Sequence, residues 1–346
     1  MQKKLIALAV AGLAAAPAFA QSNVTIYGVV DAGYGNFGDS RSDQDSRNAI
    51  DSGLGKTSRI GFKGVEDLGN GLKAAFVLEY GLAVDQKQGI NDGNARDQYV
   101  ALVGNFGTVA LGRQKTPQKV LLESADPFGG DYVTQVNTLW GYTVAGRIDN
   151  LAAYVSPSFG GFNVVAGYSF NASGNESKTT SGLDADLKTW AINPNYSNGP
   201  LKVGLNYHKV TAETLDIEDK VLDLVGSYDF GAVKLGLAYG KDKLESSLGT
   251  LADYRKWMVG ASAPVGAAGT LMVSYIQSKE KEADIKARMW GLGYKHALSK
   301  RTSLYGVYGD MNNSDGMKTN YLNTSAAGFG TGDYERAITL GVTHQF

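Results

Sequence analysis

The sequence has no cysteine, and only seven prolines and three histidines among its 346 residues. The lack of cysteine excludes disulfides, thiolate metal sites and thiol catalysis. Neither sign of charge is in large excess, because 33 lysines and arginines stand against 34 aspartates and glutamates, so the net charge gives no reason to expect nucleic acid as a partner. The sequence contains no phosphate-loop or dinucleotide motif, and we expect no cofactor and no metal.

Long hydrophobic runs are also lacking. After residue 20, no apolar stretch approaches the roughly 20 residues that a transmembrane helix needs. Before it, two lysines precede an apolar run at residues 5–16, and a small-residue pattern ends at Ala20. This order is typical of a secretory signal peptide. We predict that residues 1–20 are cleaved on export and that residues 21–346 form a single domain, which can cross a membrane only as strands.

Alternation of apolar and polar residues runs through most of the chain. The segment ITLGVTHQF places Ile338, Leu340 and Val342 on one face of a strand and small or polar residues on the other. Segments of about ten residues with this pattern are typical of a transmembrane β-barrel, whereas the strands of a β-sandwich usually have about 5–6 residues. The predicted strands lie at residues 23–36, 56–66, 72–83, 96–104, 108–115, 148–156, 162–171, 187–196, 201–210, 220–230, 232–243, 254–263, 270–279, 286–297, 302–311 and 334–346.

The connections between these strands are of two kinds. Tight turns that contain glycine alternate with longer polar segments, as expected when short turns lie in the periplasm and long loops lie outside the cell. The predicted long connections are residues 37–55, 84–95, 173–185, 211–219, 244–253 and 312–333, besides 116–146. We count sixteen strands, an even number that brings 334–346 beside 23–36 and closes an all-β, antiparallel barrel without an open edge.

Aromatic residues near the turns predict two interfacial girdles, one at each rim of the barrel. Phe346 is expected at the periplasmic rim. The other predicted girdle residues are Tyr27, Tyr80, Phe106, Phe162, Tyr196, Tyr207, Phe230 and Tyr254.

Several segments resemble the general porins of Gram-negative Betaproteobacteria. The most specific are TSRIGFKGVEDLGNGLKAAFVLEYG at 57–81, RIDNLAAYVSPSFGG at 147–161 and the terminal GVTHQF. The resemblance covers the chain from end to end, and it implies a sixteen-stranded barrel, usually a homotrimer, in the lipid of the bacterial outer membrane. Ions and small polar solutes would diffuse passively through it. In that family, a terminal phenylalanine such as Phe346 resembles the signal that the barrel-assembly machinery reads.

Residues 116–146 form a connection of about thirty residues with little alternation, and a loop this long is usually functional. The resemblance implies that this third loop folds into the lumen and narrows it, the alternative being an ordinary external loop. The resemblance also implies that the family's constriction arginines correspond to Arg59, Arg96 and Arg147, which would face the loop from the barrel wall. The full predicted constriction is Arg59, Lys63, Arg96, Arg113, Arg147, Glu123, Asp126 and Asp131.

Alternation with Ile60 and Phe62 points Arg59 and Lys63 into the lumen. Guanidinium groups in a narrow passage favour anions, and the acidic loop residues would supply the opposite side of a transverse field. Asp97, next to Arg96, departs from the most basic family members and is expected to weaken this preference. The alternative is that the arginines only hold the loop through salt bridges and leave a weakly selective pore.

Other functions remain open from the sequence. A substrate-specific outer-membrane channel and an adhesin would show the same alternation, and acidic residues such as Asp39 and Asp43 leave a Ca²⁺ site open. A barrel enzyme would need a nucleophile and a base, such as serine with histidine. Of His208, His296 and His344, only His208 is expected away from the periplasmic end, and no motif surrounds it. We therefore expect no catalytic residues.

Overall fold

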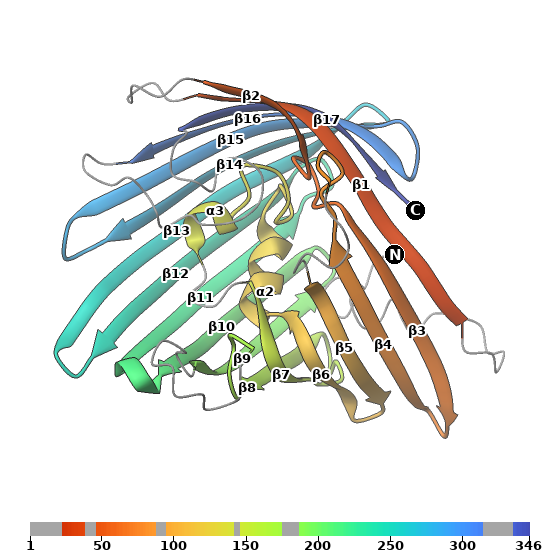
Figure 1. Ribbon diagram of the computed structural model, residues 1–346, viewed down its shortest axis with the longest axis vertical. Coiled ribbons are helices and arrows are strands. Elements are labelled where there is room, and N and C mark those ends of the chain that lie inside the picture. Colours follow the sequence, from red (N-terminus) through yellow and green to blue (C-terminus); the bar gives the residue numbers. More distant parts are fainter. Residues whose placement is uncertain (1–22, 39–45, 88–94, 142–145, 175–186, 314–334) are drawn as a thin grey trace.

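Antiparallel strands wind around a closed barrel in the computed structural model of the chain (Figure 1). The structure describes residues 23–38, 46–87, 95–141, 146–174, 187–313 and 335–346. The predicted signal peptide and the acidic residues Asp39 and Asp43 lie outside these ranges. No helix in the described part of the chain is long and apolar enough to cross a bilayer.

Within the described residues, sixteen strands form the barrel wall, each within a few residues of its predicted position, so the predicted fold class is confirmed. They are β1 (Asn23–Gly38), β3 (Arg59–Gly69), β4 (Leu72–Gly81), β5 (Ala95–Gly104), β6 (Gly107–Lys115), β7 (Arg147–Val155), β8 (Phe162–Ser169), β9 (Leu187–Asn198), β10 (Leu201–Ala212), β11 (Ile217–Asp229), β12 (Lys234–Ser246), β13 (Gly249–Val265), β14 (Gly269–Glu280), β15 (Ile285–Ala297), β16 (Thr302–Asn313) and β17 (Arg336–Gln345).

The sequence prediction missed one further strand. Part of the predicted connection 37–55 forms β2 (Arg47–Ser52). It pairs with β1 from Ala32 to Phe37, just beyond the part of β1 that pairs with β3. The loops predicted at 211–219 and 244–253 are also wrong, since β10 to β13 continue through most of them. Cross-strand ion pairs such as Lys220–Glu245 at 2.9 Å hold these polar extensions together.

The pairing of β1 with β17 closes the barrel, as predicted, in a register that runs from Val29 opposite Gln345 to Gly38 opposite Arg336. Phe346 extends it through two backbone hydrogen bonds with Gly28, of 3.1 and 3.2 Å. Its ring covers Gly28 so closely that a Cβ there would overlap it. Closure therefore depends on backbone pairing and on the absence of a side chain at Gly28.

Side chains alternate between an apolar outer face and a mostly polar or small inner face. On β17, Ile338, Leu340 and Val342 are 40%, 56% and 42% exposed, whereas Thr339 and Thr343 are buried. An exposed apolar face of this kind suits hydrocarbon as its solvent. The outer face also carries aromatic pairs that join neighbouring strands, with ring centroids 5.0–5.2 Å from each other. They are Trp190–Tyr207, Trp257–Tyr275 and Trp290–Tyr308.

Two of the predicted girdle aromatics point inward instead. The Tyr27 hydroxyl donates to Glu79 at 3.1 Å, and the Lys256 ammonium lies 5.5 Å from the ring centre of Tyr254. Both rings have polar or charged partners inside the barrel, which stabilise them on the inner face. Position near a turn therefore does not decide the face of an aromatic residue.

The third loop lies inside the barrel, where Figure 1 shows its helices α2 (Pro117–Ala125) and α3 (Asn137–Trp140). Helix α2 begins with the Thr116 side chain accepting from the Lys119 N–H at 3.2 Å and with a proline in its first turn. Gln118 and Trp140 both donate to Asp223 on the inner face of β11, each at 2.9 Å. For the described residues, an external loop is therefore excluded.

Glycines on the inner wall give the loop the room that it occupies. A Cβ built at Gly236 would overlap the Ala125 carbonyl, and one at Gly260 would lie 2.5 Å from Pro127. Four strands contribute such positions, so the loop rests on a track of bare backbone. Each glycine of this track and the loop residue nearest to it are Gly204 (Leu121), Gly236 (Ala125), Gly240 (Trp140), Gly260 (Pro127), Gly291 (Thr134) and Gly293 (Phe128).

We expect Gly236→Ala to lower the single-channel conductance. The added methyl group meets backbone rather than a flexible side chain, an overpacking that costs about 1–3 kcal/mol unless the loop moves off the wall and into the passage. Gly226→Ala is the matched control, because a Cβ there has only ordinary contacts, the nearest at 3.5 Å. Wild-type conductance in both variants would show that the track does not position the loop.

Candidate pore constriction

Three arginines of the inner wall converge on one carboxylate. Glu79 of β4 lies 2.6 Å from the Arg96 Nε, 3.5 Å from the Arg59 Nε and 3.9 Å from an Arg147 terminal nitrogen. Glu79 also accepts the Tyr27 hydroxyl, and its side chain is only 8% exposed. The structure thus brings together the three arginines predicted for the constriction, although they come from β3, β5 and β7.

A second carboxylate completes this arginine cluster. Asp97 accepts from Arg147 at 2.8 and 3.4 Å, a two-pronged contact that fixes the plane of the guanidinium group. Glu79 and Asp97 together carry two negative charges against three positive ones. The arginine cluster (Arg59, Arg96, Arg147, Glu79 and Asp97) therefore keeps an excess of positive charge.

On the loop side, Glu123 is paired with two lysines. Glu123 of α2 accepts from Lys115 at 2.8 Å and lies 2.7 Å from Lys119. Burial opposes the charge of Glu123, but the two ammonium groups outweigh it and hold the pKa of this carboxyl below its usual range. Lys115 at the end of β6 and Lys119 on α2 together outnumber this one carboxylate, so the charge around Glu123 is positive. Glu123 therefore does not provide the negative side of a transverse field.

Asp131 and Asp126 have different surroundings. Asp131 lies 3.8 Å from Lys56, and burial raises the pKa of its carboxyl. Asp126 is buried inside the loop, where it accepts the N–H groups of Phe128, Gly130 and Val136 at 2.8–3.2 Å. Burial raises the pKa of Asp126 to about 6. The expectation that Asp126 faces the passage is corrected here, because its oxygens organise the backbone of the loop.

The other two predicted cations lie outside the arginine cluster. Arg113 of β6 pairs with Asp149 of β7 at 2.6 Å. Lys63 points inward, as expected, and its ammonium lies 5.2 Å from the ring centre of Tyr27, one side chain away from Glu79. Lys63 thus adds positive charge near the cluster without joining it.

Sequence reasoning missed Glu79, Lys115 and Lys119. Glu79 could have been found, since it alternates with Phe76, Leu78 and Tyr80 and so shares the inward face of β4. Its role as the common partner of three arginines depends on strand register, which alternation alone does not give.

A polar anchor holds the loop against the opposite wall. Asp223 accepts from Gln118, from the Trp140 indole and from Asn206, the last at 3.0 Å. Lys256 donates to the Trp140 carbonyl and to Asp242. The loop is therefore held by hydrogen bonds to β11 and β13, which do not carry Arg59, Arg96 or Arg147.

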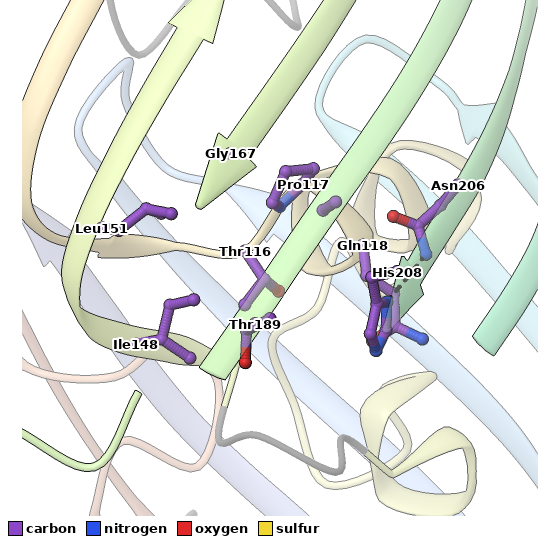
Figure 2. A pocket seen from close by; sticks show the side chains of 10 residues that line it. Thr116, Pro117, Gln118, Ile148, Leu151, Gly167, Thr189, Asn206 and His208 are labelled. Carbon is purple, nitrogen blue, oxygen red and sulfur yellow. Dashed lines mark hydrogen bonds between the residues drawn. The ribbon is translucent and has the colours of Figure 1, made fainter. Parts of the chain in front are cut away.

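Figure 2 shows the start of this anchor, a small cavity where Thr116, Pro117 and Gln118 approach strand β10. His208 lies in its wall, buried, with its Nδ1 3.1 Å from the Asn206 amide nitrogen. This position gives His208 a packing role beside the loop. In the described part of the chain, no group of three or more histidine or acidic side chains is arranged to hold a metal ion.

Comparison with known proteins places these features in a family. Residues 7–316 match the family model described as Gram-negative porin. The outer membrane porin protein 32 of Delftia acidovorans is 36% identical over the whole of both chains, and an outer membrane porin protein of Bordetella pertussis is 33% identical over 89% of this chain and 94% of its own. The solved anion-selective porin from Comamonas acidovorans is 32% identical, with a TM-score of 0.81 over 94% of this chain and 100% of its own.

The loop anchor can be tested at Asp223. We expect Asp223→Ala to increase the open-channel current noise in planar bilayers, because three buried donors lose their acceptor, at a cost of about 1–3 kcal/mol each. Asp229→Ala is the control, since this exposed carboxylate lies at the end of the same strand and accepts the Gly231 N–H in a turn, away from the loop. Equal noise in the two variants would contradict the anchor.

Proposed function

Since this chain belongs to the Gram-negative porin family and is an outer-membrane porin, we propose that its water-filled channel prefers anions to cations. Ions and small hydrophilic solutes would pass by diffusion, without a catalytic step. The observation that carries the proposal is the arginine cluster, in which three guanidinium groups share two carboxylates on the inner wall.

Charge in a narrow passage acts strongly because little water screens it. The positive excess of the arginine cluster is reinforced by Lys115 and Lys119 around Glu123 on the loop. Such a surplus raises the local concentration of anions and lowers that of cations. The carboxylates keep the guanidinium groups in place, so an arriving anion meets a preformed surface rather than mobile side chains.

The alternative, in which the arginines only hold the loop, is less well supported. The ion pairs that the structure gives for Arg59, Arg96 and Arg147 are to Glu79 and Asp97, which are wall residues. The loop has its own anchor at Asp223 and Lys256. The name of the similar porin from Comamonas acidovorans, which describes it as anion-selective, also supports the proposal.

Some expectations from the family resemblance stay predictions. They are a homotrimer, recognition of Phe346 by the barrel-assembly machinery, export through the segment 1–20, and constriction of the channel by residues 116–146. The relatives support a porin rather than an enzyme, and we propose that this chain has no catalytic activity.

We expect replacement of Arg59, Arg96 and Arg147 by glutamine to reduce the anion-to-cation permeability ratio several-fold. The triple variant removes three positive charges from the passage and leaves Glu79 and Asp97 unpaired. The measurement is the reversal potential in a salt gradient across a planar bilayer. Glutamine at Lys188, Lys209 and Lys220 is the control, because it makes the same charge change on the outer face and should leave the reversal potential unaltered. An unchanged potential in the arginine variant would refute the filter.

Glu79→Gln should shift the reversal potential in the opposite direction. This change removes the negative charge that three arginines share and keeps the size of the side chain, so the anion preference should rise. The single-channel conductance checks that the passage stays open. A shift toward cations would mean that Glu79 acts mainly by holding the arginines in position rather than by offsetting their charge.

A further inference from the structure

Five lysines on the inner wall lie between the constriction and the periplasmic end of the barrel. On β3 and β4, Lys63 and Lys73 are closer to the tight turn at residues 70–71 than Arg59 and Glu79 are. On β10, β12 and β15, a lysine lies two residues on the periplasmic side of a glycine of the loop track. We call this set the periplasmic lysines, and its members are Lys63, Lys73, Lys202, Lys234 and Lys295.

Strand alternation places the periplasmic lysines on the inner face, because residues two apart share a face. Lys202, Lys234 and Lys295 are each two residues from a glycine at which an added Cβ would meet the third loop. Lys73 shares its face of β4 with the buried Ala75. These side chains therefore line the interior on the periplasmic side of the loop rather than the lipid-facing surface.

The charges of the periplasmic lysines are not neutralised within the described part of the chain. None of the five makes an ion pair there, in contrast to Lys256 on the extracellular side, which lies 2.7 Å from Asp242. Lys234 donates to the Ser124 carbonyl of the loop at 3.0 Å, a contact that positions its ammonium group and leaves its charge in place.

Acidic side chains on the same inner surface are few. The described residues include the tight turns at the periplasmic end, and there the inner face carries Asp67 and Asp229. Each accepts the N–H of a glycine two residues further on, at 2.9 and 2.8 Å, and neither makes an ion pair with a lysine. The cations outnumber these carboxylates, so this part of the interior is positive.

Some of these cations are close enough to repel one another. The ammonium group of Lys202 is within electrostatic reach of that of Lys234, and the ammonium group of Lys295 is within reach of that of Lys56. Like charges held near one another destabilise a folded protein, so the arrangement does not serve folding. Its direct effect is a positive potential that extends about 10 Å into water at 0.1 M salt.

We propose that the periplasmic lysines form a second selectivity region, a cationic vestibule that concentrates small anions on the periplasmic side of the constriction. This inference rests on the proposed anion preference and assigns part of that preference to residues outside the arginine cluster. A positive potential enriches divalent anions more strongly than monovalent ones, because the energy of an ion scales with its charge. The vestibule therefore favours small polyvalent anions in particular.

Salt concentration separates the vestibule from the constriction. An ion in the narrow passage comes so near the guanidinium groups that little electrolyte lies between them, whereas the lysines act on ions across water. The Debye length is about 30 Å at 0.01 M salt and about 3 Å at 1 M. The lysines should thus affect selectivity in dilute salt only, and the arginines in both.

The test is the reversal potential of single channels in potassium chloride gradients, centred on about 0.01 M and on about 1 M salt. The variant replaces Lys73, Lys202 and Lys295 by glutamine, because these three make no hydrogen bond or ion pair with the loop or the arginine cluster in the described structure. We expect the anion-to-cation permeability ratio to fall about twofold or more in dilute salt and to stay unchanged in concentrated salt. Wild-type conductance at the higher concentration shows that the variant is folded.

Glutamine at Lys188, Lys209 and Lys220 makes the same charge change on the outer face and is the matched control, with no change expected at either concentration. If the wild-type channel prefers anions and the vestibule variant keeps its ratio in dilute salt, the vestibule is refuted and the arginine filter stands. An equal loss in the control, or an equal loss at both salt concentrations, would also refute the vestibule. A wild-type channel that prefers cations would overturn the proposed function itself, and this inference with it.

Discussion

Pairing of β1 with β17 is the interaction on which the rest of this structure depends. In hydrocarbon, an unpaired N–H or C=O has no water to bind, so an open edge in the wall would cost several kcal/mol per group. Asp31 strengthens the seam from inside, because its buried carboxylate accepts from the Gly55 and Lys56 N–H groups, from Tyr305 and from Thr343. One side chain thus ties the first strand, the last two strands and the segment after β2 together.

Sequence alternation predicted the wall because the wall obeys a single rule, with one face in lipid and the other inside. It failed where that rule stops. β2 and the outer parts of β10 to β13 stand in water, where ion pairs such as Lys220–Glu245 can replace apolar alternation. The girdle prediction for Tyr27 and Tyr254 was wrong for a related reason, since a ring with a polar partner is stable on the inner face too.

The candidate site was predicted only in part, and the missing part is the set of partners. Alternation tells which way Arg59 points, but not that Gly61 lies opposite Glu79 on the next strand and brings the two charges within 3.5 Å. The role of Asp126 was hidden for another reason, because its contacts are with backbone N–H groups of a loop without periodicity. Residue type indicated charge in the constriction, whereas the fold decides which charges remain uncompensated.

Strand register also decides which side chains line the passage. Arg59 faces the lumen only because of its parity on β3, where it alternates with Ile60. A slip of β3 by one residue would place Arg59 against hydrocarbon and Ile60 in the passage. A charged side chain on the lipid face destabilises the barrel, so this register is unfavourable. The closed pairing of β1 with both β3 and β17 prevents that slip, since no strand can move without breaking the ladder on both sides. The same backbone constraint that keeps the barrel intact in lipid therefore also fixes which side chains line its passage.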